Sequence, residues 1–123
     1  MHTGTVLVIS GPAGSGKDTI TDILTQRTLL RRFPTYTTRE PRSGEIDGVH
    51  YRFVTRERFE ELWQAGKLID RAGMHDFYGC PKDDLLEAIG RGDDVILHLV
   101  FDSARTFAEV VPNVVTVFLL PPG

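Results

Sequence analysis

Eight residues near the amino terminus have the types and spacing of a phosphate-binding loop. They are Gly11, Pro12, Ala13, Gly14, Ser15, Gly16, Lys17 and Asp18. Small residues let successive backbone N–H groups turn inward around a polyphosphate, and the lysine reaches the outer phosphates. The positive amino-terminal end of a following helix favours the same anion. We therefore expect this loop, with Thr19 just beyond it, to bind the phosphates of a nucleotide.

The last position of the loop departs from the usual pattern, which has Ser or Thr after the lysine to hold Mg²⁺. In this chain Asp18 follows Lys17. Thr19 is a poor substitute, because on a helix it points about 100° further round. Mg²⁺ prefers oxygen ligands and keeps several waters, so a carboxylate is a reasonable ligand. We predict that Asp18 holds the metal.

The flanking sequence supplies the strand and helix that such a loop needs. Thr5 to Ser10 is an apolar, β-branched run typical of a strand buried on both faces. After the loop, apolar residues recur at helical spacing, at Ile20, Ile23, Leu24 and Leu30. A glycine-rich turn that binds nothing is the alternative. The strand–loop–helix order favours phosphate binding.

A second candidate site lies in the run Thr37 to Glu45, which reads TTREPRSGE. Arg39 and Arg42, on a loop braced by proline, can grip one phosphate by charge-assisted hydrogen bonds. Tyr51 follows, and its hydroxyl can complete the grip. A solvated loop of mixed charge is the alternative. The neighbouring phosphate loop favours a functional role.

With these motifs on two separate segments, the chain resembles guanylate kinase. The TTRxPRxGE run, Tyr51 and the Phe77-Tyr78-Gly79 triplet are similar to the GMP-binding domain of that family. The resemblance extends from Thr5 to Pro122. It implies an α/β fold, with a P-loop NTPase-type parallel sheet and a small mixed α/β insertion. The implied reaction transfers the γ-phosphate of Mg·ATP to GMP, with ATP and GMP as partners and Mg²⁺ as cofactor.

The resemblance also implies roles for single residues. The catalytic groups would be Lys17, Arg39 and Arg42. The acceptor phosphate would be held by two arginines and two tyrosines, which match Arg39, Arg42, Tyr51 and Tyr78. The carboxylate that reads guanine matches Asp70, because it can accept from two N–H groups that adenine does not offer. Two small residues that help to hold the base match Thr35 and Cys80, and a thiol is a weaker partner than a hydroxyl.

Two further features depart from the family. The family carries two acidic residues on a core strand. The matching positions in this chain are His98 and Val100, so both acids are replaced. A packed strand residue is the favoured interpretation of His98, over a catalytic base. The family continues after the strand matching Val114 to Leu120 with an arginine-bearing lid, another strand and a helix. We therefore expect a C-terminally truncated core, with activity reduced by the missing lid.

The remaining sequence predicts one domain, with a core at 1–33 and 81–123 and an acceptor-binding insertion at 34–80. Thr55 is expected to cap a helix that ends at Gly66, and Pro81 to begin another that ends near Gly90. Strands are expected at Phe33–Thr37, Tyr51–Val54, Lys67–Ala72, Phe77–Gly79, Asp94–Phe101 and Val114–Leu120, the last of them buried, with a helix at Ser103–Val110.

Composition narrows the classes of function. The chain has 123 residues, 41% hydrophobic content and a net charge of −3, which disfavours a broad nucleic-acid surface. A single cysteine excludes an internal disulfide framework, and no apolar run approaches the ~18 residues of a membrane span. With no visible signal peptide, we expect a cytoplasmic protein.

Two alternatives stay open. The sequence GKD at the end of the phosphate loop and the replacement of the strand acids also make the chain similar to ribose 1,5-bisphosphate phosphokinase. That enzyme makes phosphoribosyl pyrophosphate. Against it, the complete TTREPR run, Tyr51 and Asp70 suit a guanine nucleotide. The other alternative is an inactive nucleotide- or phosphopeptide-binding module. The intact glycines and Lys17 weigh against that module.

Overall fold

The core of the molecule is a four-stranded parallel sheet, with strand order β2-β6-β1-β7. A computed structural model describes residues 3–12, 15–99 and 101–120. The core strands are β1 (Val6–Ser10), β2 (Arg31–Arg32), β6 (Val95–His98) and β7 (Val114–Phe118). This confirms the predicted α/β class and parallel core. The short β2 was not predicted, because two arginines carry no strand pattern.

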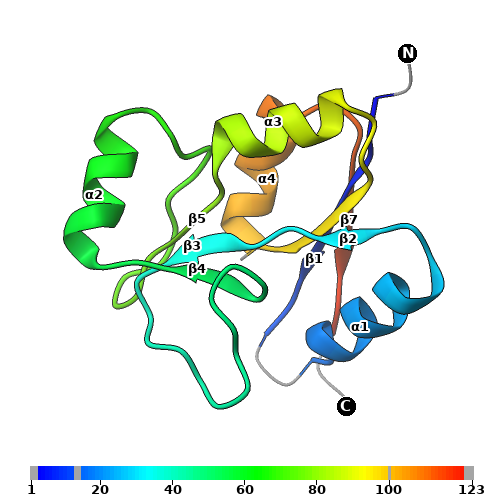
Figure 1. Cartoon of the computed structure of the whole chain (residues 1–123), viewed down its shortest axis with the longest axis horizontal. Helices are drawn as coiled ribbons and strands as arrows, with labels where there is room; N and C mark the ends of the chain where they lie inside the picture. Colours follow the sequence, from blue (N-terminus) through cyan, green and yellow to red (C-terminus); the bar gives the residue numbers. More distant parts are fainter. Residues whose placement is uncertain (1–2, 13–14, 100, 121–123) are drawn as a thin grey trace.

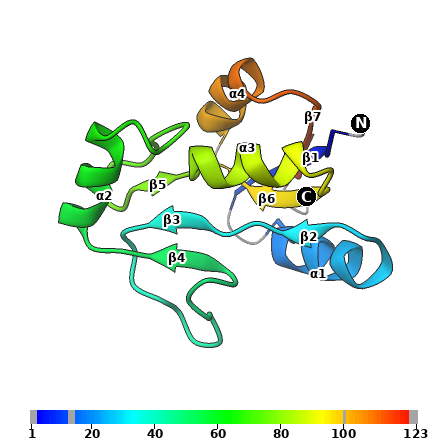
Figure 2. The same ribbon diagram turned by 45° about the horizontal axis from the view of Figure 1, so that its top comes forward.

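Helices cover both faces of this sheet (Figures 1 and 2). On one face α3 (Lys82–Gly90) and α4 (Phe101–Val110) pack against inward-pointing residues of β1 and β6. The opposite face carries α1 (Lys17–Arg27), which directly follows the phosphate loop. The main buried cluster includes Val6, Val8, Leu85, Ile89, Val95, Leu97 and Phe107. No helix within the described ranges is long and apolar enough to span a membrane.

A second, smaller sheet has the order β4-β3-β5 and lies beside the core (Figure 2). Its strands are β3 (Thr35–Thr37), β4 (Tyr51–Phe53) and β5 (Tyr78–Gly79). The β3–β4 pair is parallel and the β3–β5 pair antiparallel, as expected of a mixed unit. Phe59 and Leu62 of α2 (Arg56–Gln64) pack on this sheet. The predicted cap is confirmed, since the Thr55 hydroxyl accepts from the Arg58 N–H at 3.1 Å.

Two strand predictions differ clearly from the structure. Strand β6 ends at His98, and Phe101 already begins α4, whereas we expected a strand to Phe101. A continuous apolar run does not mark where a strand stops and a buried helix starts. Within Lys67–Ala72 the chain forms only isolated bridges, from Leu68 to Pro81 and from Ala72 to Tyr78.

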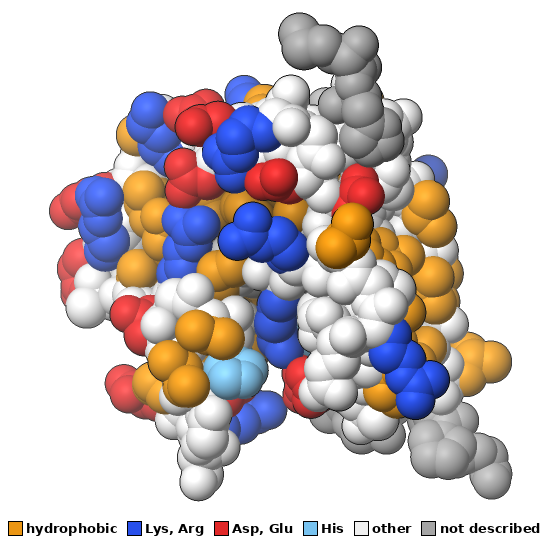
Figure 3. Space-filling view, turned by 45° about the vertical axis from the view of Figure 1, so that its right-hand side comes forward, with side chains coloured by type: hydrophobic (Ala, Val, Ile, Leu, Met, Phe, Trp, Pro, Cys, Tyr) orange, Lys and Arg blue, Asp and Glu red, His pale blue; other side chains and the backbone are white. Residues whose placement is uncertain are grey.

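Strand β7 is more exposed than predicted. It is an edge strand, and Val115 and Phe118 are 52% and 50% exposed. In Figure 3 hydrophobic side chains gather along one margin of the molecule, on the side of β7. The predicted apolar stripe of α1 is also only partly covered, because Ile23 is exposed and Thr21 is the buried residue. Sequence periodicity predicts which residues share a face but not what lies against that face.

Candidate functional site

The phosphate loop joins the carboxyl end of β1 to the amino end of α1, where ligands bind in open α/β sheets. Gly16 adopts φ 91°, a left-handed conformation that favours glycine, and begins the helix. The Ser15 N–H donates to the Pro12 carbonyl at 3.2 Å. The predicted loop residues Ala13 and Gly14 lie outside the described ranges.

Lys17 folds back along this loop. Its Nζ donates to the Gly11 carbonyl at 2.7 Å, and burial lowers its pKa while Asp18 partly opposes that shift. A Cβ on Gly11 would lie 2.7 Å from the Leu119 carbonyl oxygen, so only glycine fits. The Ser15 hydroxyl oxygen is buried without a hydrogen-bond partner among the described residues. The loop therefore holds a cation and an unsatisfied hydroxyl at the site predicted for phosphates.

One hollow of about 570 Å³ connects the two motifs. It lies between the core and the smaller sheet, and Figure 3 shows Lys and Arg side chains in and beside it. From the phosphate loop it is lined by Gly16, Lys17, Asp18 and Thr19, and from the insertion by Arg39, Arg42, Glu45, Tyr51 and Tyr78. The structure thus brings both predicted phosphate sites to a common space. His98 and Leu99 complete the lining.

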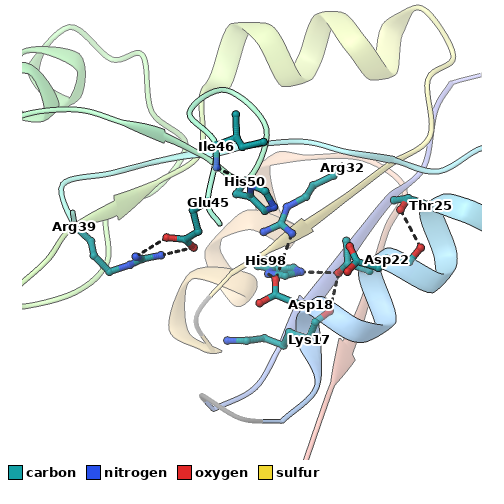
Figure 4. A network of polar contacts seen from close by, with 11 residues as sticks. Lys17, Asp18, Asp22, Thr25, Arg32, Arg39, Glu45, Ile46, His50 and His98 are labelled. Atoms are coloured by element: carbon teal, nitrogen blue, oxygen red, sulfur yellow. Dashed lines mark hydrogen bonds and ion pairs between the residues drawn. The ribbon is translucent and has the colours of Figure 1, made fainter. Parts of the chain in front are cut away.

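Arg39 is fixed by a partner that the sequence analysis did not assign. Glu45 accepts two hydrogen bonds from its guanidinium, at 2.9 and 3.0 Å, and one from the Arg42 N–H at 2.7 Å. Chiefly through the Arg39 hydrogen bonds, the pKa of Glu45 falls to about 2. Glu45 belongs to the TTREPRSGE run, so the motif contained the signal. Its carboxylate holds the guanidinium of Arg39 (Figure 4) and the backbone N–H of Arg42.

The two predicted tyrosines meet at Arg39. The guanidinium of Arg39 lies 5.1 Å from the ring centroid of Tyr51, and the Tyr51 and Tyr78 rings are 6.1 Å apart. Burial, followed by Tyr78, raises the pKa of Tyr51, while Arg39 opposes the rise. The Tyr51 hydroxyl therefore stays protonated at neutral pH, which lets it donate to an anion.

The predicted base-reading residues form a separate buried group. Asp70 is 5% exposed, and its Oδ1 accepts from the Cys80 N–H at 3.0 Å. Its Oδ2 is buried and has no hydrogen-bond partner in the described part of the chain. Burial raises the pKa of Asp70, and Ser103 and the Cys80 N–H oppose the rise. Asp70 lines a second hollow, together with Ser103 and Trp63, and is not among the residues that line the first.

Thr35 is the first residue of β3, and Cys80 directly follows the paired strand β5. The antiparallel register pairs Tyr36 with Gly79, so its continuation places Thr35 beside Cys80. Both side chains are buried, and burial raises the pKa of the Cys80 thiol well above its usual value. The Cys80 thiol donates to the Pro81 carbonyl over 3.7 Å, which is a weak contact.

A compact polar cluster lies at the amino end of α1. The Arg32 Nη1 is 3.3 Å from Asp18 Oδ1, and His98 Nδ1 is 3.9 Å from the same oxygen. His98 Nε2 lies 2.6 Å from the Thr21 hydroxyl. Arg32 was not predicted as a site residue, because it belongs to no recognisable sequence motif. His98 is a packed residue at the end of β6, as predicted, while Val100 lies outside the described residues.

Asp18 suits a metal ion that arrives with a nucleotide. Its carboxylate is 79% exposed and lines the hollow next to Lys17. In the described ranges, no group of three or more His, Cys, Asp or Glu residues could hold a metal by itself. Mg²⁺ is commonly bound by one or two carboxylates together with substrate phosphates and water. A single carboxylate beside the phosphate loop fits that mode.

Acidification is expected to destabilise the free protein through His98. Burial first, and then Arg32, lower the pKa of His98 to about 4, against about 6.5 in an unfolded chain. Between these values the unfolded chain binds the proton more readily. Stability should therefore fall as the pH drops from about 6.5 to about 4, by up to about 3 kcal/mol. Above about pH 6.5 this effect should vanish.

Urea unfolding in the presence of a chelator, at about pH 7 and about pH 4.5, checks this expectation. His98→Gln should lose less stability over the interval than the wild type. His75→Gln is the matched control, because His75 is exposed. An equal loss for the wild type and His98→Gln would contradict the assignment.

Comparison with known proteins agrees with this geometry. The guanylate kinase family model matches residues 3–123. The guanylate kinase of Clostridioides difficile is 41% identical over 98% of this chain and 60% of its own length. That of Carboxydothermus hydrogenoformans is 42% identical over 100% of this chain and 61% of its own. The chain therefore spans about 60% of the length of these curated relatives.

A solved structure gives the same result in three dimensions. The crystal structure of guanylate kinase from Anaplasma phagocytophilum superposes with a TM-score of 0.81 and 31% sequence identity. The match covers 99% of this chain and 63% of that one. Fold, motifs and relatives agree, and the chain belongs to the guanylate kinase family.

Proposed function

We propose that this protein transfers the γ-phosphoryl group of ATP to GMP, giving ADP and GDP. One observation carries the proposal: a phosphate loop and an arginine–tyrosine cluster, from two separate segments, line the same hollow. In the reaction, the bond from the γ-phosphorus to the β–γ bridging oxygen breaks. A new bond forms between that phosphorus and a phosphate oxygen of GMP. No general base is needed, because the acceptor is already anionic.

We assign the donor side to the core (1–33 and 81–123) and the acceptor side to the insertion (34–80). The loop backbone and Lys17 would bind the ATP phosphates, so that positive charge meets the transferred group. Asp18 would hold the Mg²⁺ ion, whose charge neutralises the β- and γ-phosphates. The acceptor phosphate would lie against Arg39, Arg42, Tyr51 and Tyr78.

Guanine recognition would fall to Asp70, with Thr35 and Cys80 beside it. The buried Oδ2 of Asp70 supports this assignment, because an unpaired buried oxygen is costly unless a ligand supplies a donor. Guanine offers two N–H groups to a carboxylate. A sugar bisphosphate has no base edge for Asp70 to read, which favours GMP over ribose 1,5-bisphosphate.

A thermal-unfolding titration with GMP, ribose 1,5-bisphosphate and AMP, without ATP, tests the acceptor. At ~100 times the dissociation constant, GMP should add about 2.7 kcal/mol of stability and raise the Tm by several degrees. Neither of the other compounds should match it. Asp70→Asn should remove the preference for GMP over AMP, because an amide cannot accept from both N–H groups as a carboxylate does.

The same protein with ATP and GMP should then form ADP and GDP, which chromatography separates. A Tm shift with ribose 1,5-bisphosphate alone would move the assignment to the phosphoribosyl reaction. Binding without any turnover, with either acceptor, would leave a nucleotide-binding module.

A further inference from the structure

Arg32 lies beside the hollow, in contact with Asp18 of its lining, and its own side chain lines a neighbouring hollow. It comes from β2, and its side chain is only 14% exposed. Figure 4 shows it pointing from β2 toward Asp18 and His98, which both line the hollow. Its Nη1 lies 3.3 Å from Asp18 Oδ1. A guanidinium has five N–H donors, so this contact leaves most of its binding capacity for another acceptor.

The charge of Arg32 reaches both sides of the hollow. Its guanidinium pairs with Asp18 on the core side, at 3.3 Å. It also opposes the rise in the pKa of Tyr51, which belongs to the acceptor cluster. The charge of Arg32 therefore acts on a core residue that it contacts and on a residue of the insertion.

The ion pair that restrains Arg32 is weak enough to exchange. The Asp18 carboxylate is 79% exposed, so solvent screens its pair with Arg32, and screened pairs contribute little to stability. Phosphates carry more charge than one carboxylate, and a guanidinium matches two of their oxygens at once. An incoming phosphate chain can thus displace Asp18 from Arg32.

We propose that Arg32 binds the phosphate groups where donor and acceptor meet, and that Asp18 holds it ready there in the free protein. This inference rests on the proposed function, because it needs phosphates on both sides of the hollow. A purely structural role, joining β2 to α1, is the competing explanation. Such a role would change stability alike with and without ligand, and it would not distinguish one ligand from another.

Calorimetry with three ligands separates the two explanations. The ligands are ADP, GMP, and an adenosine–guanosine dinucleotide joined by five phosphates, which spans both sites. For Arg32→Ala the dissociation constant of the dinucleotide should rise by about tenfold or more, as expected for a lost charge-assisted contact. Those of ADP and GMP alone should rise by less than about threefold. Arg32→Lys should recover part of the loss, because it restores the charge without the planar fork.

Arg31→Ala is the matched control, since Arg31 is the exposed neighbour on the same short strand. It should bind all three ligands like the wild type. Wild-type affinity of Arg32→Ala for the dinucleotide would overturn the inference, as would an equal loss for GMP alone. Should Arg32→Ala not fold, Arg32→Gln and Arg32→Lys carry the same comparison. A wild type that binds neither GMP nor the dinucleotide would overturn the proposed function itself, and this inference with it.

Discussion

Arg39→Ala is expected to raise the dissociation constant for GMP by about 100-fold or more, and that for ATP by less than about threefold. Each charge-assisted hydrogen bond to a phosphate contributes about 1.5–3 kcal/mol, and Arg39 can make two. A second effect adds to this loss. Glu45, which Arg39 now neutralises through bonds of 2.9 and 3.0 Å, would be left as an unpaired anion beside the acceptor phosphate.

The double variant Arg39→Ala/Glu45→Ala separates these two effects. It should bind GMP more tightly than Arg39→Ala alone, because the repelling carboxylate is gone. Arg58→Ala is a matched control, since Arg58 forms an exposed ion pair with Glu61 on α2, away from the hollow. Calorimetric titration with GMP and with ATP measures both constants. Equal losses for the two nucleotides would contradict the assignment of Arg39 to the acceptor side.

Local motifs predicted the parts of the site that depend on neighbouring residues in the chain. The phosphate loop, the TTREPR run and the Thr55 cap each need only a few consecutive residues, and the structure has each near its predicted place. The meeting of Lys17 with Arg39 in one hollow agrees with a general rule, that ligands bind beyond the carboxyl ends of parallel strands.

The contacts that cross the fold were not predictable in this way. The Arg32–Asp18 ion pair joins residues from β2 and α1, and its formation depends on β2 pairing with β6. The exposed face of β7 was missed because a Val-rich run looks the same whether or not another layer covers it. The same limit made β6 too long. Sequence patterns carry local preferences, whereas these features depend on tertiary packing.

Asp18→Ala should change ATP affinity in opposite directions with and without Mg²⁺. In a chelator, the wild-type carboxylate repels the phosphates and holds Arg32 through the 3.3 Å ion pair. Its removal should therefore tighten metal-free ATP binding, by about three- to tenfold. With Mg²⁺ present, the variant lacks the protein ligand that we assign to the metal. Its affinity for Mg·ATP should then fall below that of the wild type, by about tenfold.

Titrations of ATP in excess chelator and in excess Mg²⁺, at one ionic strength, measure the two opposite changes in affinity. Asp18→Asn keeps the shape of the side chain without its charge, so it should follow Asp18→Ala in the chelator and lie between Asp18→Ala and the wild type with Mg²⁺. A loss of affinity under both conditions would mean that Asp18 organises the loop and does not bind the ion. A gain under both would mean that it serves only to hold Arg32. The two changes are opposite because a carboxylate beside a polyphosphate is unfavourable until a cation lies between them. The uncharged hydroxyl usual at this position would not reverse its effect on ATP affinity in this way.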